Sequence, residues 1–233
     1  MRAFVLGSIV LAGLLGPARS VQADEPATDH ARVVGSVGIG WFGVSEIPLG
    51  QLDQRVVAPA LGVRWWLSER VGLDLGLGLS IVSQVGSADV NGMVTIDDDG
   101  PFTLGVLGHV GVPIALYQGR HYTLLVVPEL NVGVASQSST NDRADDDQLP
   151  LESERSGLRV DAGGRAGAEI HFGFIGLPEL ALEASVGLFF SHEATSQSSG
   201  GSSREATRTQ LVTTSFNDPW DFFRSAVAAR YYF

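Results

Sequence analysis

The segment that most constrains the fold is VGLDLGLGLSI, which runs from Val71 to Ile81. Apolar side chains occupy every odd position of this segment, and Gly, Asp or Ser occupies every even one. Alternation of this kind has the two-residue period of a β-strand, in which successive side chains point to opposite faces. One face of the predicted strand is therefore wholly apolar, and the other is small or polar.

The same alternation predicts seven further strands. They cover residues 32–44, 55–67, 102–117, 121–135, 157–172, 179–191 and 221–233. Their connections alternate in length: residues 68–70, 118–120 and 173–178 are short, whereas residues 45–54, 84–100, 137–156 and 192–218 are long and polar. An even number of strands with all long loops at one end is typical of a transmembrane barrel with short periplasmic turns and long extracellular loops. The predicted fold class is therefore all-β, an eight-stranded antiparallel up-and-down β-barrel.

The charged side chains of these strands lie opposite the apolar faces. A membrane barrel turns its apolar face to lipid and keeps polar groups in the lumen, whereas a soluble barrel does the reverse. We therefore expect a closed lumen, filled by an ion-pair network for which the Gly and Ala residues of the first four strands make room. The expected members are Arg64, Asp74, Glu129, Arg159, Asp161, Arg165, Glu169, Glu183, Arg224 and Arg230. The alternative is that the same groups line a narrow channel for small solutes.

The C-terminal residues, ARYYF, continue the alternation to the last position. Tyr231 and Phe233 are expected to face lipid at the inner membrane–water interface, and Tyr232 is expected to point into the barrel base. A terminal Phe preceded by alternating aromatic and apolar residues resembles the assembly signal of bacterial outer-membrane proteins. Over residues 32–233 the chain resembles the small eight-stranded outer-membrane barrels of the OmpA/OmpX type. This resemblance implies three partners: outer-membrane lipid, lipopolysaccharide, and the assembly machinery, which would read Phe233.

The N-terminal residues predict export, and the resemblance to outer-membrane barrels implies a Gram-negative cell. Arg2 precedes an apolar run too short to span a bilayer, and small residues at Val21 and Ala23 provide a cleavage site. We expect a signal peptide at residues 1–23, a short periplasmic segment at residues 24–31 and the barrel domain at residues 32–233. The expected location is the cell outer membrane. The chain has no cysteine and a net charge of −11, which argues against nucleic acid as a partner.

The sequence predicts no catalytic, cofactor-binding or metal-binding residue. Ser191 and His192 are the best candidates for an enzyme, but neighbours on a strand point to opposite faces and cannot form a nucleophile–base pair. Outer-membrane deacylases carry a His-x-Ser pattern, and here Ala194 takes the place of the Ser. A lipid-modifying enzyme is therefore the least favoured function. The leading hypothesis is a non-enzymatic protein that has a structural role or binds partners through its outer loops.

Three prolines fall inside predicted strands, at Pro59, Pro113 and Pro128. Proline has no N–H to donate, so these positions are expected to show an irregularity such as a bulge.

Overall fold

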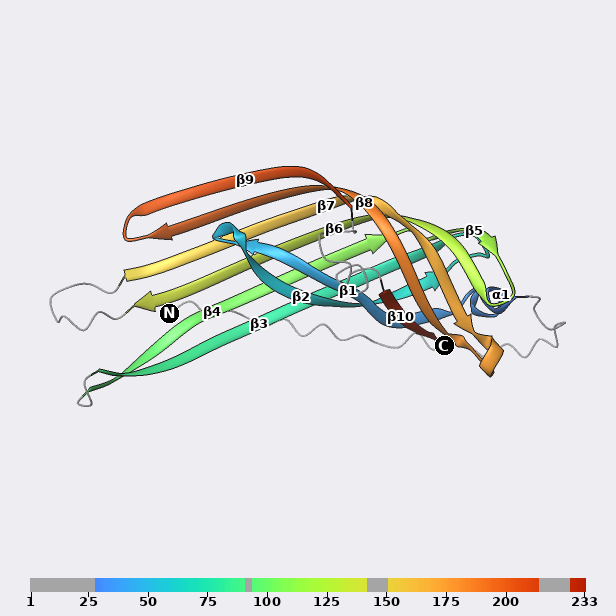
Figure 1. Ribbon diagram of the computed structural model, residues 1–233, viewed down its shortest axis with the longest axis horizontal. Coiled ribbons are helices and arrows are strands. Elements are labelled where there is room, and N and C mark those ends of the chain that lie inside the picture. Colours follow the sequence, from blue (N-terminus) through green and yellow to red (C-terminus); the bar gives the residue numbers. More distant parts are fainter. Residues whose placement is uncertain (1–27, 91–93, 142–150, 214–226) are drawn as a thin grey trace.

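In the computed structural model, residues 28–90, 94–141, 151–213 and 227–233 are described, and nearly all of them belong to antiparallel strands (Figure 1). The strands are β1 Val37–Leu49, β2 Gln51–Trp66, β3 Gly72–Val90, β4 Val94–Gly111, β5 Ile114–Gln118, β6 Tyr122–Asn141, β7 Leu151–Phe172, β8 Leu177–Ser199, β9 Ser202–Thr213 and β10 Val227–Tyr232. Two short helices, α1 Asp29–Val33 and the 3-10 turn η1 Gly173–Ile175, lie at the end of the barrel where β10 ends, which we call the inner end. Neither helix of this described part has the length and apolarity to cross a membrane.

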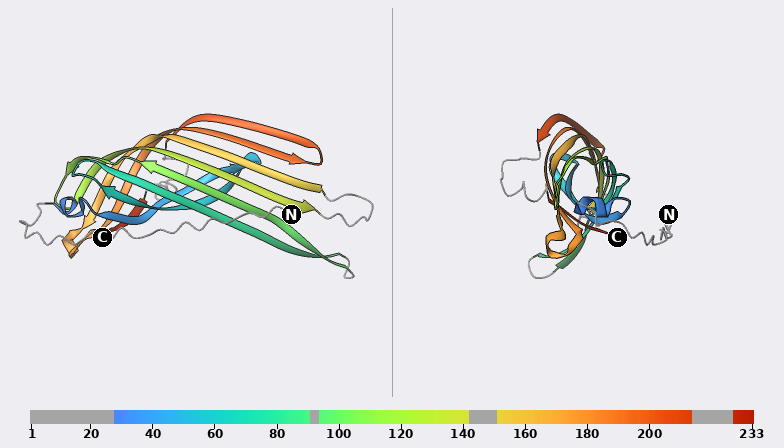
Figure 2. Two further views of the ribbon diagram at one scale, coloured as in Figure 1. Left: turned by 180° about the vertical axis from the view of Figure 1, so that it is seen from behind. Right: turned by 90° about the vertical axis from the view of Figure 1, so that its right-hand side faces the viewer.

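The strands close into an eight-stranded antiparallel barrel, as the sequence predicted. The ring contains β1, β2, β3, β4, β6, β7, β8 and β10, and β10 closes it by pairing with β1 on one edge and β8 on the other. Two of the described strands lie outside this ring. β5 follows β4 along the chain and pairs with β6. β9 pairs with residues 188–199 of β8, whereas β10 pairs with residues 180–184 of the same strand. Figure 2 (right) shows the ring along its long axis.

Two of the three strand prolines lie where a ladder is interrupted. Pro113 separates β4 from β5, so the predicted strand 102–117 is split. Pro59 lies just beyond Ala60, the last residue of β2 that pairs with β3. Because proline lacks the N–H that such a ladder needs, β2 separates from β3 at this point. Pro128 remains inside β6, opposite Gly164.

β1 separates from its other neighbour at nearly the same level. Its pairing with β10 covers only Gly38 to Trp41, and a bulge follows at Phe42, with Gly43 at a φ of 118°. A bulge bends the strand that carries it, and a positive φ of this size favours glycine. Within the part of the chain that the structure describes, residues 43–59 therefore pair with neither β3 nor β10. We call them the plug hairpin.

The plug hairpin folds into the barrel. Four consecutive residues at its turn, from Ile47 to Gly50, are buried, which is possible only because both faces of the hairpin are covered there. The backbone N–H of Gly50 donates to the carbonyl oxygen of Ser156 on β7, at 3.2 Å. Figure 2 shows the blue hairpin inside the ring of strands. The prediction of a long outer loop at residues 45–54 is therefore wrong.

An apolar cluster surrounds this hairpin. It consists of Ile47, Leu49, Val56, Ala58, Ala60, Leu107 and Ala135, with Phe42 packed against it. A Cβ atom added at Gly133 would lie 2.8 Å from Cγ1 of Ile47, and one added at Gly105 would lie 2.7 Å from Cγ1 of Val56. At Gly105, where we expected room for crossing arginines, the missing side chain thus makes room for the hairpin.

The N-terminal part of the barrel differs from the prediction. The strand expected from Arg32 begins at Val37, because residues 29–33 form α1 below the barrel base. The side chain of Thr28 caps this helix by accepting from the backbone N–H of Ala31, at 3.2 Å. Val33 is buried in a second apolar cluster that contains Trp66, Ala115, Ala181 and Tyr232.

At the outer end the strands run further than predicted. β3 and β4 extend to Val90 and from Val94, so most of the expected loop 84–100 is a hairpin. β6 and β8 likewise continue into the expected loops 137–156 and 192–218. Residues 202–213 of the expected loop 192–218 form β9. Residues 91–93, and residues 221–226 of the last predicted strand, lie outside the described residues.

Candidate functional site

Seven charged side chains meet in the inner half of the lumen. We call them the inner cluster, and they are Arg64, Asp74, Glu129, Arg165, Glu169, Glu183 and Arg230. They come from six different strands because inward positions of neighbouring strands lie at the same level. Arg64 is at the centre and fully buried. Its Nε and Nη2 donate to the two carboxylate oxygens of Asp74, both at 2.6 Å.

The other contacts join the cluster across the barrel. Nη1 of Arg64 donates to Glu183 at 2.8 Å and to Glu169 at 3.2 Å. Arg165 donates through Nε to Glu129 at 2.6 Å and also contacts Glu183. Nη1 of Arg230 donates to Glu183 at 2.7 Å. Three arginines therefore face four carboxylates, and charge-assisted hydrogen bonds of this kind compensate groups that would otherwise be costly to bury.

Aromatic residues and α1 lie below the inner cluster. The Tyr232 hydroxyl donates to Glu169 at 2.7 Å, and Nε1 of Trp66 donates to the Tyr232 oxygen at 3.1 Å. The His30 ring of α1 packs edge-on against Trp66, with 4.4 Å between ring centroids, and its Nε2 donates to the carbonyl oxygen of Glu69 at 2.9 Å. Asp29 lies 2.6 Å from Nδ1 of His121. These contacts attach the helix to the base of the barrel.

Phe42 separates the inner cluster from the plug hairpin. Its ring centroid is 4.7 Å from Cζ of Arg230, which is within the range of a cation–π interaction. On the same level, His109 packs against Phe42 with 5.3 Å between centroids, and its Nδ1 lies 2.7 Å from Oδ1 of Asn131. The apolar cluster of the hairpin follows above this layer.

A second group of charges lies further out and surrounds the plug hairpin. We call it the outer cluster, and it consists of Arg55, Arg159, Asp161, Glu193 and Arg208. Glu193 is only 1% exposed and lies 3.3 Å from Nη2 of Arg55, 3.4 Å from Nε of Arg208 and 3.9 Å from Nη1 of Arg159. Asp161 accepts from Nε of Arg159 at 2.8 Å.

Two arginines of the outer cluster also hold the hairpin backbone. Nη1 of Arg159 donates to the carbonyl oxygen of Glu46 at 2.9 Å, and Nη2 of Arg208 donates to that of Leu52 at 2.7 Å. Arg155 adds a contact between Nη1 and the side-chain oxygen of Gln54, at 3.3 Å. The hairpin is thus attached to β7 and β9 chiefly by side chains and not by a continuous β-ladder.

The structure divides the ten residues expected in one network. Seven of them form the inner cluster, whereas Arg159 and Asp161 lie in the outer cluster. Arg224 lies outside the described residues. Sequence reasoning missed Glu193 and Arg208, because they lie beyond the end of the predicted strand 179–191, and it missed Arg55, because its position in the predicted strand 55–67 has the parity opposite to that of Arg64. The signal was available for Glu193, which has the same inward parity on β8 as Glu183.

The C-terminal aromatic residues alternate in and out. Tyr232 is buried, whereas Tyr231 and Phe233 are exposed, with their ring centroids 5.0 Å apart. The backbone N–H of Phe233 donates to the carbonyl oxygen of Val37 at 3.1 Å, so the last residue is joined to the first strand.

Ser191 and His192 do not form a catalytic pair. Ser191 is fully buried and points inward, whereas Nδ1 of His192, on the other face of β8, lies 2.8 Å from Oγ1 of Thr209. Within the described ranges, no group of three or more His, Asp and Glu side chains is placed to hold a metal ion.

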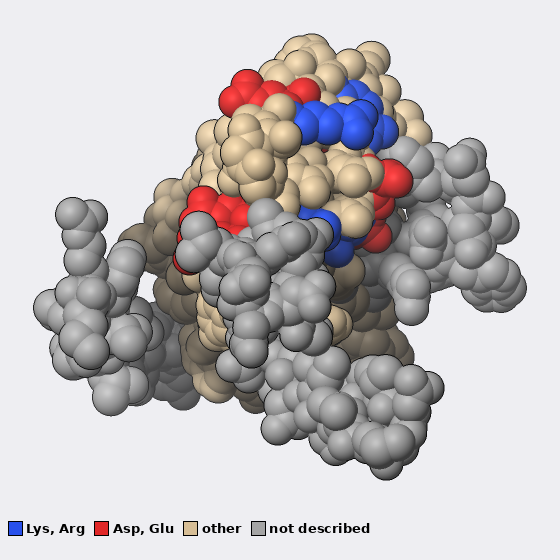
Figure 3. Space-filling model, turned by 90° about the vertical axis from the view of Figure 1, so that its left-hand side faces the viewer, with Lys and Arg blue, Asp and Glu red and all other residues tan. Residues whose placement is uncertain are grey.

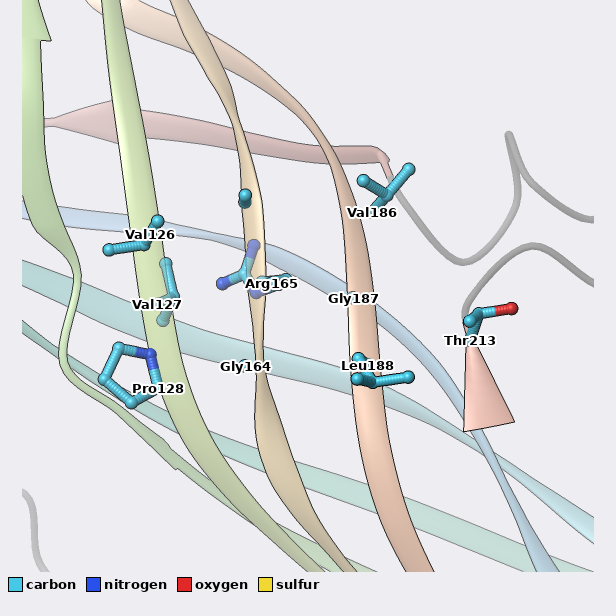
Figure 4. A pocket seen from close by; sticks show the side chains of 10 residues that line it. Val126, Val127, Pro128, Gly164, Arg165, Val186, Gly187, Leu188 and Thr213 are labelled. Carbon is cyan, nitrogen blue, oxygen red and sulfur yellow. The ribbon is translucent and has the colours of Figure 1, made fainter. Parts of the chain in front are cut away.

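One cavity of about 780 Å³ lies against β6, β7 and β8 (Figure 4). Most of its lining is apolar and outward-facing, including Val126, Val186 and Leu188, and Arg165 is its charged member. The cavity reaches Thr213, the last described residue of β9. It is therefore separate from the two clusters except at Arg165.

No protein-family model matches the sequence, and no curated protein matches it. A major outer membrane protein from Thermus thermophilus is a solved structure with a partly similar fold. The two chains are 14% identical, and the superposition covers 85% of this chain and 98% of that chain with a TM-score of 0.40. A likeness at this TM-score is too distant to transfer fold or function.

Proposed function

We propose that this chain is an integral outer-membrane β-barrel with a closed lumen, which catalyses no reaction and acts in membrane structure or in binding partners at its outer end. The observation that supports this most is the inverted distribution of side chains. Charged groups are buried inside the barrel, and large apolar groups are exposed on its outside. A soluble barrel of this kind would be unfavourable, because it would expose a continuous apolar belt to water.

The outward face has the dimensions of a membrane belt. On β3 the exposed series comprises Leu75, Leu77, Leu79 and Ile81, and on β6 it comprises Tyr122, Leu124, Leu130, Val132 and Val134. Ten residue steps, as from Leu124 to Val134, correspond to about 33 Å along a strand. With a tilt of about 40° this gives a height of about 25 Å, which is the apolar band of outer-membrane barrels. Exposed aromatic side chains at the inner end, such as Tyr117 and Tyr231, suit the membrane–water interface.

Three successive layers support a closed lumen. Trp66 and Tyr232, which we call the aromatic floor, lie at the base together with α1. The inner cluster lies above them, and the plug hairpin fills the lumen further out. Arg64, Glu169 and Glu183 are fully buried, as expected where side chains fill the lumen at their level. An eight-stranded barrel has an interior just wide enough for side chains to fill, and these layers fill it.

The proposed partners follow from the surface. Outer-membrane lipid and lipopolysaccharide would contact the belt, and the assembly machinery would recognise Phe233, which is 74% exposed. The outer end, seen in Figure 3, intersperses acidic and basic side chains among uncharged ones, and surface ligands would bind there. Secretion through a signal peptide at residues 1–23 would deliver the chain to the outer membrane.

Planar-bilayer recording of refolded residues 24–233 tests this function. We expect insertion without steady current, for the parent chain and for Arg165→Ala alike, with Arg165→Ala lowering stability. Reproducible openings whose ion preference changes in Arg165→Ala would instead establish the narrow channel. Failure to insert into lipid would contradict the membrane placement itself. Hydrolysis or acyl transfer on lipopolysaccharide, abolished by Ser191→Ala, would establish the lipid-modifying enzyme.

A further inference from the structure

We infer that the plug hairpin is a movable plug held by a latch centred on Glu193, so that the barrel has a second form in which its outer half is an open cup. This inference concerns the lumen and depends on the barrel fold, not on the proposed membrane placement. It assigns the outer cluster a role distinct from that of the inner cluster.

The hinges lie where both wall ladders end. On one side Gly43, with its positive φ, follows the bulge at Phe42, and on the other side Pro59 ends the pairing of β2 with β3. Beyond these points the two arms of the hairpin still pair with each other, from Gly43 opposite Ala60 to Leu49 opposite Gln51. The hairpin can therefore swing as a unit without breaking its own ladder, because in the described part of the chain its pairing with β3 and β10 ends at the hinges. The backbone hydrogen bond that the swing would break is the one from the Gly50 N–H to the carbonyl oxygen of Ser156 on β7.

Besides its apolar packing and the Gly50 hydrogen bond, the hairpin is held by a small number of polar contacts around one carboxylate. Glu193 lies among three guanidinium groups, of which Arg55 belongs to the hairpin and Arg159 and Arg208 belong to the wall. The same two wall arginines donate to hairpin carbonyl oxygens. Without the Glu193 charge, Asp161 is the remaining carboxylate of the outer cluster, and Arg55 would meet two like charges. The three guanidinium groups lie close together because each lies within 4 Å of the same carboxylate, and without that carboxylate their mutual repulsion favours release of the tip.

Release of the tip would expose a cup but not open a channel. The inner cluster contains no residue of the plug hairpin, and its contacts join β2, β3, β6, β7, β8 and β10 below the hinges. The aromatic floor and α1 are also independent of the hairpin. The lumen is therefore closed at two levels, by the inner cluster and by the plug hairpin. Of these two, the plug hairpin alone depends on Glu193.

Cysteine labelling of the refolded barrel in micelles measures the release directly, because the chain has no native cysteine. Leu49→Cys places a thiol at a buried position of the plug hairpin, and Asp53→Cys places one at an exposed position of the same hairpin. We expect a bulky water-soluble maleimide to react with Leu49→Cys far more slowly than with Asp53→Cys. Adding Glu193→Gln should speed labelling of Leu49→Cys by about tenfold or more, since labelling of a buried site follows its local opening. Glu205→Gln, at an exposed carboxylate of β9, is the matched control and should leave the rate unchanged.

Each contrary result has a defined meaning. Equal labelling of Leu49→Cys and Asp53→Cys in the parent background would show that the hairpin is not seated in the lumen. Unchanged labelling of Leu49→Cys in folded Glu193→Gln would show that no latch exists. If Glu193→Gln does not fold, Arg208→Gln replaces it. This variant removes one of the three arginine contacts of Glu193 and should likewise speed labelling of Leu49→Cys. Steady current through Glu193→Gln in a planar bilayer would overturn the claim that the inner closure is independent.

Discussion

Arg64 shows at the scale of a single residue how much one buried charge can organise. It contacts three carboxylates from three other strands and has no exposed surface. We predict that Arg64→Met lowers the free energy of unfolding by about 3–5 kcal/mol, because removing one partner leaves buried carboxylates without compensation. Urea titration of the refolded barrel measures this. Arg120→Met, at an exposed arginine of an inner turn, should change it by less than about 0.5 kcal/mol. Equal losses in the two variants would contradict a central role for Arg64.

His30 makes the seating of α1 sensitive to pH. Burial lowers the pKa of this imidazole below its usual value, since the ring lies against Trp66 and away from water. The unfolded chain then binds a proton at higher pH than the folded chain does. Stability is therefore expected to fall as the pH falls below about 6.5. Thermal unfolding at neutral and mildly acidic pH should show a smaller acid-induced loss in His30→Gln than in the parent. His192→Gln, on the outside of β8, should keep the parental loss, and the prediction is wrong if both variants behave alike.

The inward positions of single residues could be predicted from the sequence, but their partners could not. Alternation places Arg64, Asp74, Glu169 and Glu183 on one side of their strands, and the structure has them there. Which carboxylate meets which arginine depends on the stagger between neighbouring strands, and alternation contains no information on stagger. For this reason Arg159, expected in one network with Arg165, lies instead beside Glu193 in the outer cluster.

At the scale of elements, the plug hairpin is the feature that fills the lumen. A methyl group at Gly133 would overlap Ile47, so we predict that Gly133→Ala destabilises the barrel by about 1–3 kcal/mol, the usual cost of overpacking. In an Ile47→Ala background the same substitution should cost close to nothing. Urea titrations of the four chains of this double-mutant cycle measure the coupling. Gly108→Ala is the control, since its nearest neighbour would be 4.0 Å away. Additive effects of the two substitutions would contradict the contact between hairpin and β6.

The position of this hairpin could not be predicted, for a physical reason. Inside the barrel both faces of a strand are covered, so Ile47, Pro48 and Leu49 follow one another without the alternation of a wall strand. With Glu46 before them and Gln51 to Gln54 after them, they have the composition of an exposed loop. The two departures from the wall, at Gly43 and Pro59, are visible in the sequence only as residues that weaken a strand. α1 was missed similarly, because five residues are too few to show a helical period.

At the scale of the whole molecule, the layers inside the barrel and the belt outside it are consequences of one inversion. The strand faces that are apolar in the sequence are those exposed in the structure, and the charged faces are buried. A barrel with this distribution is stable only if the medium around the middle of its outer surface is itself apolar. The same argument explains why the strands become polar on both faces at their outer ends, where Ser156, Ser196 and Ser198 point outward.

A charge placed on the belt tests this inversion. Leu77 is 72% exposed near the middle of the β3 series, and we predict that Leu77→Arg lowers the stability of the barrel in lipid vesicles by about 2–4 kcal/mol, the cost of a guanidinium near the bilayer midplane. Ser198→Arg, on the outward face of β8 well beyond the belt, should cost close to nothing. Folding in vesicles, followed by urea titration, measures both, and detergent micelles should reduce the difference because a micelle deforms around a charge more readily than a bilayer. If Leu77→Arg is tolerated in vesicles as well as Ser198→Arg is, this side of the barrel faces water, and the exposed apolar series must be covered by something other than lipid.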